Sequence, residues 1–316
     1  MLTASLAGEL FAGAALLLFS VNIILTKVAA VRVKLDLGFL VSVSVNVLFA
    51  ALLFLAQWVW RSDRVVWQSE GFAFFLLAGA FSTWLGRWFF LESVVQFGPS
   101  RASIFQITSP LFTALFAWTF LSEALRTLEL AGMGMAMAGL LLVMTGASSA
   151  GLSGGKGRAG NSAAGGHGHS RLQQSALVLG LGSSIAYSLG NIFRGAAIRN
   201  WDEALLGALI GASAGLALHA AFSRDKKQLL GRLRNADRRG VLLFAISGVL
   251  TISAQTCLIL SLKYIPVSVA ALITLCTPLL VFPMSYLLLK NSEKITMATV
   301  LGGVLTLAGV ALIVIL

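Results

Sequence analysis

The sequence predicts an all-α membrane protein with about ten transmembrane helices, arranged as two inverted five-helix repeats. Three observations lead to this fold class. The chain has 316 residues, of which 58% are hydrophobic and only 11% are charged. It contains apolar segments long enough to cross a bilayer, and short motifs of its first half recur in the same order in its second half.

The composition excludes an ordinary water-soluble domain, in which about one residue in four is charged. The mean hydropathy is +0.90, and lipid is the solvent that accepts so much apolar surface. The net charge is +11. Because the basic residues lie mostly between apolar segments, they are expected to fix orientation and contact anionic head groups rather than nucleic acid.

The first half contains five apolar segments. The first covers residues 6–28 and has no Lys or Arg before Lys27, so it lacks the basic start of a secretory signal. The others lie near 37–60, 72–97, 100–121 and 128–147. Helices are expected for all five, because strands would leave backbone groups unpaired in lipid and the alternation of a barrel strand is missing.

Five further segments form the second half, near residues 174–197, 203–222, 241–263, 266–290 and 295–316. Residues 148–173 lie between the halves and are rich in Gly and Ser, as flexible linkers are. We therefore expect a first repeat over 1–147, a linker over 148–173 and a second repeat over 174–316.

No cofactor or metal site is expected. His167 and His169 lie in the glycine-rich linker without other ligands near them. Cys257 and Cys276 lie inside apolar segments, where cysteine behaves as a small buried residue.

Five short motifs repeat between the halves at a nearly constant spacing. They are Asn22-Ile23 with Asn191-Ile192, Phe97-Gly98-Pro99-Ser100 with Tyr264-Ile265-Pro266-Val267, Thr108-Ser109-Pro110-Leu111 with Cys276-Thr277-Pro278-Leu279, Ser122-Glu123 with Ser292-Glu293, and Ala138-Gly139 with Ala308-Gly309. This pattern indicates duplication of one unit. Because five spans is an odd number, the second copy must enter the membrane from the opposite side, which makes the repeats inverted.

With these motifs the chain resembles the drug/metabolite transporter superfamily, in its EamA-like branch. The carrying segments run from Pro99 to Pro110 and from Pro266 to Pro278, each followed by Ser-Glu and then by Ala-Gly. The family usually has Gly before the Glu, where Ser122 and Ser292 stand here. The resemblance implies a ten-helix secondary carrier with a central cavity. Members move amino acids, other metabolites, nucleotide sugars or drugs, mostly outward, and the resemblance does not indicate which.

Arg87 is the most informative polar residue, because a charge at membrane depth is costly and normally faces a bundle interior or a cavity. With helical spacing, Trp84 shares a face with Arg87 and with Trp88. One interpretation is that Arg87 binds an anionic group such as a substrate carboxylate. The other is a snorkelling or internally paired arginine.

Other polar groups lie in the apolar segments. Asn22 and Asn191 occupy matched positions in the first helix of each half, where amides join helices or bind a polar ligand. Tyr187, Asn191 and Arg194 form one stripe, in which Arg194 either snorkels or contributes to the site. We predict a substrate-binding cavity lined by Arg87, Trp84, Trp88, Asn22, Gln106, Tyr187 and Asn191.

Prolines and glutamates mark matched positions in the two halves. Pro110 and Pro278 are predicted to kink the fourth and ninth helices, either at a cavity or for packing alone. Glu123 and Glu293 are predicted as helix caps at the starts of the fifth and tenth helices, with a proton or cation site as the alternative.

The residues and the resemblance together predict a secondary transporter that exports a small metabolite, such as an amino acid, by alternating access through a central cavity between the repeats. The alternative is an exporter of cationic drugs or quaternary amines, which would need a membrane-embedded carboxylate, and Glu92 is the candidate. A membrane enzyme acting on a lipid-linked substrate is a further alternative, but its motifs are missing from the sequence.

The expected partners are a small-molecule substrate, membrane lipid and either a proton or an exchanged solute, with no nucleic acid, in a monomer or homodimer. The expected location is the inner (plasma) membrane. Most Lys and Arg lie in one set of predicted loops, including the stretch from Arg224 to Arg239. The excess of basic residues in cytoplasmic loops then places both termini outside.

Overall fold

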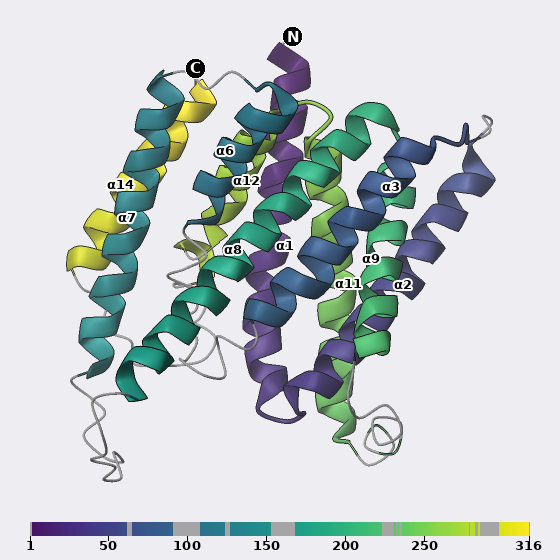
Figure 1. Cartoon of the computed structure of the whole chain (residues 1–316), viewed down its shortest axis with the longest axis horizontal. Coiled ribbons are helices and arrows are strands. Elements are labelled where there is room, and N and C mark those ends of the chain that lie inside the picture. Colours follow the sequence, from purple (N-terminus) through teal and green to yellow (C-terminus); the bar gives the residue numbers. More distant parts are fainter. Residues whose placement is uncertain are drawn as a thin grey trace. The chain divides into compact units, whose positions relative to one another are not determined.

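A computed structural model describes residues 2–61, 65–90, 108–123, 127–152, 168–222, 231, 233, 236–277, 279–281, 284 and 297–315 (Figure 1). These residues are helical or lie in short connections, and none of them is in a strand. The first-half helices are α1 (Leu2–Ala30), α2 (Leu35–Trp60), α3 (Ser69–Ala78) with its continuation η1 (Gly79–Gly86), α6 (Ser109–Leu121) and α7 (Thr127–Leu152). The second-half helices are α8 (Gly168–Asn200), α9 (Ala204–Phe222), α11 (Arg238–Ser261), α12 (Val267–Leu275) and α14 (Met297–Ile315).

Membrane-spanning length and composition are found in five of the described helices. They cover Ser5–Ala30, Asp36–Trp60, Ser69–Phe90, Ala204–Phe222 and Arg238–Ser261. Shorter apolar helices cover Phe112–Leu121, Leu130–Gly139, Val267–Val281 and Val300–Gly309. With α3 and η1 taken as one segment, each half contributes five helical segments within the described residues. The prediction of an all-α membrane protein is confirmed.

Helix boundaries differ from the sequence prediction at the centre of the chain. α7 continues to Leu152 and α8 begins at Gly168, so both helices extend into the stretch 148–173 that its composition assigns to a linker. Residues 153–167 lie outside the described part. The exact division into repeats and linker stays a prediction.

The third helix contains a feature that periodicity does not predict. From Gly79 to Gly86 it is a π-helix, whose backbone bonds reach one residue further than in an α-helix. Such segments are uncommon and occur often at functional sites. The π-helix changes which side chains of this region share a face.

Two compact units make up the fold. The first contains Met1–Trp84 and Leu189–Val281, and the second contains Leu85–Ser188 and Phe282–Leu316. The division falls within η1 and within α8, so both helices contribute residues to each unit. Each unit therefore combines helices from both halves of the sequence.

The first unit is internally symmetric. A Cβ on Gly207 of α9 would collide with the ring of Phe75 in α3, and a Cβ on Gly38 of α2 would collide with the ring of Phe244 in α11. The sequence spacing from Gly38 to Gly207 equals that from Phe75 to Phe244, and we call it the repeat spacing. The contact of α3 with α9 is thus repeated as the contact of α11 with α2, in which each helix is replaced by its equivalent from the other half.

Two further contacts of the first unit obey the same repeat spacing. Gly79 approaches the Gly211 carbonyl as its equivalent Gly248 approaches the Ser42 carbonyl. Gly71 contacts Trp201 as its equivalent Gly240 contacts Arg32 and Val33. A pseudo-two-fold relation between the halves produces such reciprocal pairs.

The second unit shows the direction of the two repeats. A Cβ on Gly139 of α7 would lie 2.5 Å from the Gly302 carbonyl oxygen of α14, and one on Gly309 would lie 2.6 Å from the Gly132 carbonyl oxygen. Moving forward along α14 therefore means moving backward along α7, so the fifth helices of the two halves are antiparallel. Antiparallel equivalents are what inverted repeats require.

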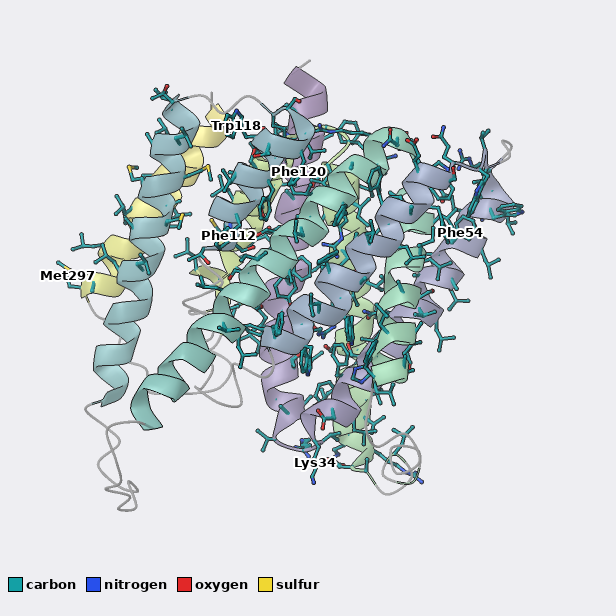
Figure 2. All side chains as sticks on the ribbon, in the orientation of Figure 1. Lys34, Phe54, Phe112, Trp118, Phe120 and Met297 are labelled. Carbon is teal, nitrogen blue, oxygen red and sulfur yellow. The ribbon has the colours of Figure 1, made fainter. Side chains whose placement is uncertain are left out.

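Large apolar side chains are numerous on the exposed helix surface. Trp118 and Phe120 of α6 and Met297 of α14 are exposed and carry labels in Figure 2. A water-soluble protein rarely exposes so many large apolar groups, whereas lipid-facing helices do.

Candidate functional site

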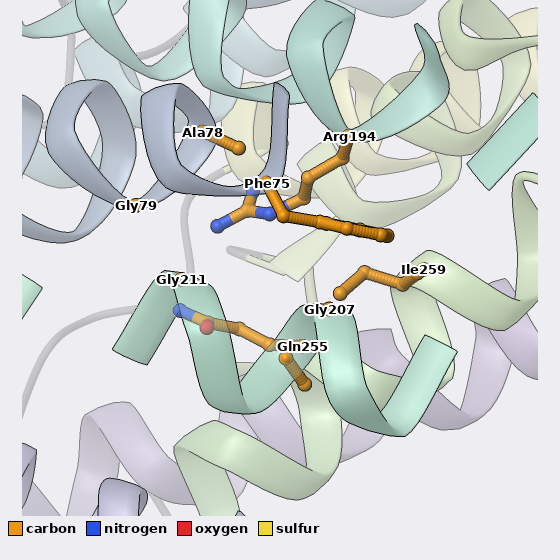
Figure 3. Close-up of a pocket in the computed structure, with 9 residues that line it drawn as sticks. Phe75, Ala78, Gly79, Arg194, Gly207, Gly211, Gln255 and Ile259 are labelled. Carbon is orange, nitrogen blue, oxygen red and sulfur yellow. The ribbon is translucent and has the colours of Figure 1, made fainter. Parts of the chain in front are cut away.

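The first unit contains a small cavity at the junction of four helices. Its walls come from α3 with η1, α8, α9 and α11, and the lining residues are Phe75, Ala78, Gly79, Arg194, Gly207, Ala208, Gly211, Gln255 and Ile259 (Figure 3). The space is about 10 Å³, which is the size that holds about one water molecule. Of the three glycines in the wall, Gly79 and Gly207 let α9 approach α3 and η1 closely.

Arg194 is the charged residue of this cavity, and only 6% of its surface is exposed. One guanidinium nitrogen donates to Ser82 Oγ at 2.5 Å, and another donates to Asn191 Oδ1 at 3.1 Å. Ser82 in turn donates to the Ala78 carbonyl at 2.8 Å. These bonds hold the guanidinium in place inside the helix bundle.

Burial of Arg194 decides between the two interpretations of this residue. Snorkelling requires α8 to end near it, but α8 continues to Asn200 and the guanidinium is directed into the protein. Asn191 and Arg194, which the sequence places on one stripe, are hydrogen-bonded to each other. The predicted set of cavity residues omits Arg194, because the depth of a helix position cannot be obtained from its periodicity.

Two other predicted site residues belong to the first unit. Asn22 of α1 is buried and accepts a hydrogen bond from Ser247 of α11 at 2.6 Å. Trp84 packs against Phe222 of α9, with ring centroids 4.8 Å apart. Asn22 therefore joins two helices.

Arg87, Trp88 and Tyr187 belong to the second unit. Arg87 and Tyr187 are close enough to interact electrostatically. Trp88 is 53% exposed and stacks on Phe89, with ring centroids 5.3 Å apart. The predicted common face of Trp84 and Arg87 assumes α-helical spacing, and the π-helix through Gly86 changes that spacing.

Gln106, Pro278 and Glu293 lie outside the part of the chain that the structure describes. Pro110 lies in the first turn of α6, where its missing N–H costs no helical hydrogen bond. Residues 91–107 are not described, so a kink at Pro110 stays a prediction. Ser122 ends α6 in the left-handed conformation with φ 53°, and the Glu123 N–H bonds to the Ala117 carbonyl at 3.2 Å.

Ser122 and Glu123 thus lie at the C-terminal end of α6 rather than directly at the start of α7, which begins at Thr127. Residues 124–126 are not described. Capping of α7 by the Glu123 side chain stays a prediction.

Spanning helices, antiparallel equivalent repeats and buried polar groups define a class of protein, the multi-pass membrane transporter built from an inverted duplication. The chain belongs to the EamA-like transporter family, whose family model matches residues 6–145 and 174–315. Members of this family are transporters and not enzymes. A small-molecule substrate and surrounding membrane lipid follow from this membership.

Comparison with solved structures supports the fold. A structure titled "Crystal structure of protein" is 16% identical in sequence and has a TM-score of 0.70, over 97% of this chain and 96% of the other. At this identity the likeness shows the fold alone. Comparison with curated proteins gives no match.

Proposed function

We propose that the protein is a secondary carrier that exports a small metabolite carrying an anionic group, such as an amino acid, by alternating access in the inner membrane. The reciprocal contacts at the repeat spacing are the observation that supports this mechanism most. Two halves that make equivalent contacts with exchanged roles are able to exchange conformations, which opens a site to one face and then to the other.

The guanidinium groups of buried Arg194 and half-buried Arg87 favour an anionic substrate group over a cationic one. Arg194 lines a cavity of the first unit, and Arg87 lies in the helix that continues from η1 in the second. Arginine binds carboxylates through charge-assisted hydrogen bonds. We infer that Arg87, with Trp84, Trp88, Tyr187, Asn191, Asn22 and Gln106, contributes to substrate binding.

An exporter of cationic drugs is the second candidate. It would need a carboxylate at membrane depth, and Glu92 lies outside the described residues. The sequence contains no ATP-binding motif, so uphill transport would draw on a proton gradient or on solute exchange.

Transport by the purified protein in liposomes tests the proposal. Amino acids, purines, sugars and quaternary amines are offered at acid and neutral internal pH, and uptake of each solute is measured. We expect accumulation of a carboxylate-bearing solute that depends on the pH gradient or on a counter-solute. Accumulation of quaternary amines alone would reject the proposed substrate class.

Replacement of Arg87 tests its role in the same assay. Arg87→Ala is expected to lower the transport rate at least tenfold, because the anionic group loses its charged partner. Arg238→Ala is the matched control, since Arg238 is exposed at the start of α11. Unchanged transport of every identified substrate by Arg87→Ala would remove Arg87 from the site.

A further inference from the structure

The backbone of η1 has a hydrogen-bonding pattern that the first part of the same helix does not share. Ser69–Ala78 is α-helical, whereas Gly79–Gly86 is a π-helix, in which backbone N–H groups bond to carbonyls five residues earlier. Most π-helices are single turns inside an α-helix, and the eight residues of η1 exceed one turn. A π-helix of this length is expected to need support from the side chains around it.

Two serine hydroxyls supply such support at the ends of η1. Ser82 Oγ donates to the Ala78 carbonyl at 2.8 Å, directly before the π-helix, and Ser183 Oγ of α8 donates to the Gly86 carbonyl at 3.1 Å, where it ends. Within a membrane, serine side chains satisfy carbonyls where a helix departs from the regular α pattern. The π form is therefore stabilised in part by α8.

Thr83 is the residue that the π form leaves unsatisfied. Its hydroxyl is buried and has no hydrogen-bond partner in the described part of the chain, and its side chain packs against Gly215 of α9. Buried Thr251 and Thr256 of α11 instead donate to the carbonyl four residues earlier, as threonine does in an α-helix. An unpaired buried hydroxyl costs free energy. The α form would offer Thr83 the Gly79 carbonyl.

The packing around η1 is compatible with an α-helix. By the repeat spacing, residues 248–255 of α11 are equivalent to η1, and they are α-helical. Gly248 approaches the Ser42 carbonyl as Gly79 approaches the Gly211 carbonyl. The same close contact with a neighbouring helix is thus made by a segment in the α form.

From these observations we propose that η1 is a conformational switch, which converts between the π and α forms during the transport cycle. A shift of one residue in register turns the side chains that follow by about 100° around the helix axis. Arg87 and Trp88 follow η1 directly, so the conversion turns both of them while α3 keeps its packing. The switch rests on the proposed function, because it decides in which form Arg87 faces the substrate.

A spin label directly after η1 tests for the two forms. The label is attached to Trp88→Cys in the full-length protein with Cys257 and Cys276 replaced by alanine, in liposomes without added solute. Trp88 is 53% exposed, so its position has room for a label. We expect two components in the electron paramagnetic resonance spectrum. Leu52→Cys, exposed in the middle of α2, is the control for a position in a regular helix.

Variants of η1 and α8 assign the components, because rotamers of the label also produce more than one. Thr83→Val keeps the size of the side chain and removes the hydroxyl that only the α form pairs, so it should shift the component ratio toward the π form about fivefold. Ser183→Ala removes the donor to Gly86 and should shift the ratio in the opposite direction. Thr256→Val, which removes a hydroxyl from α-helical α11, should leave the ratio unchanged.

Opposite shifts in the two variants would support the switch. An unchanged ratio in both, or a shift in the same direction, would overturn it. If Ser183→Ala does not fold, the presence or absence of the shift in Thr83→Val decides. Since the label is read without a substrate, transport with an unchanged ratio rejects the switch and keeps the carrier. Opposite shifts in a protein that transports none of the tested solutes would keep the two forms of η1 and reject the carrier.

Discussion

Glu203 is a buried carboxylate at the start of α9, and its ion pair is placed to stabilise the fold. Arg61, at the end of α2, donates to it at 2.6 Å, and the Glu203 side chain is only 6% exposed. Removing one partner of such a pair leaves an uncompensated charge away from water. Arg61→Ala is therefore expected to lower the free energy of unfolding by about 3 kcal/mol, the lower end of the range for a broken buried pair.

The pair of Arg32 with Asp237 is the matched control for this prediction. Its N–O distance is 3.2 Å, and both side chains are exposed by 40% or more. Because solvent screens both charges of this pair, Arg32→Ala should have little effect on the free energy of unfolding. SDS titration of both variants in mixed micelles measures the difference. An equal loss in the two variants would contradict a special role for Glu203.

Single residues also show how much of the site the sequence can predict. The amide positions Asn22 and Asn191 can be identified because they repeat at a fixed spacing in apolar segments. Burial of Arg194 is not predictable, since it depends on the depth of α8 in the fold and on Ser82, which lies far away in the sequence. Periodicity gives the face of a helix but neither its depth nor its partner.

At the scale of helices, glycine residues allow the backbones of α7 and α14 to approach each other closely. A Cβ on Gly139 or Gly309 would lie 2.5 or 2.6 Å from backbone atoms of the other helix. Gly139→Ala and Gly309→Ala are each expected to lower the free energy of unfolding by about 1 to 3 kcal/mol, because the helices must separate. The two effects should be similar, since the positions are equivalent.

Gly134→Ala is the control on α7, where an added Cβ would meet nothing within 4 Å. Alanine favours a helix over glycine, so stability should rise by up to about 1 kcal/mol. The same SDS titration compares the three variants. Equal destabilisation at positions 134 and 139 would mean that close approach is not what glycine provides at 139.

The number of helices is predictable from the lengths of the apolar segments, but a change from α-helix to π-helix within a segment is not. The ten segments predicted from hydropathy match the ten helical segments of the described residues. The π-helix from Gly79 to Gly86 has no local signal, because its composition is that of any small-residue helix. It changes the α-helical spacing on which the predicted common face of Trp84 and Arg87 depends.

At the scale of the whole chain, duplication with an odd number of spans is enough to predict inversion. The repeat of Ala138-Gly139 at Ala308-Gly309 gives the spacing, and the antiparallel contact of α7 with α14 follows from it. The composition of the two compact units is not predictable in this way. Each unit takes helices from both repeats, and that choice depends on long-range packing.

Inversion also predicts where equivalent connections lie in the membrane. Lys34 follows α1 and Asp202 follows α8, which are the first helices of the two repeats. Both residues are exposed, so cysteine at either position should react with a maleimide that cannot cross membranes. In a background with Cys257 and Cys276 replaced by alanine, we expect Asp202→Cys to react in intact cells. Lys34→Cys should react only after permeabilisation, because basic loops face the cytoplasm.

The labelling experiment tests the inversion of the repeats and the orientation of the protein in the membrane separately. Reaction of Lys34→Cys alone in intact cells would keep the repeats inverted and reverse the orientation that the basic residues favour. Reaction of both variants from the same side would mean that the first helices of the two repeats cross in the same direction. Reciprocal contacts such as those of Gly38 and Gly207 would then need an explanation other than inverted duplication.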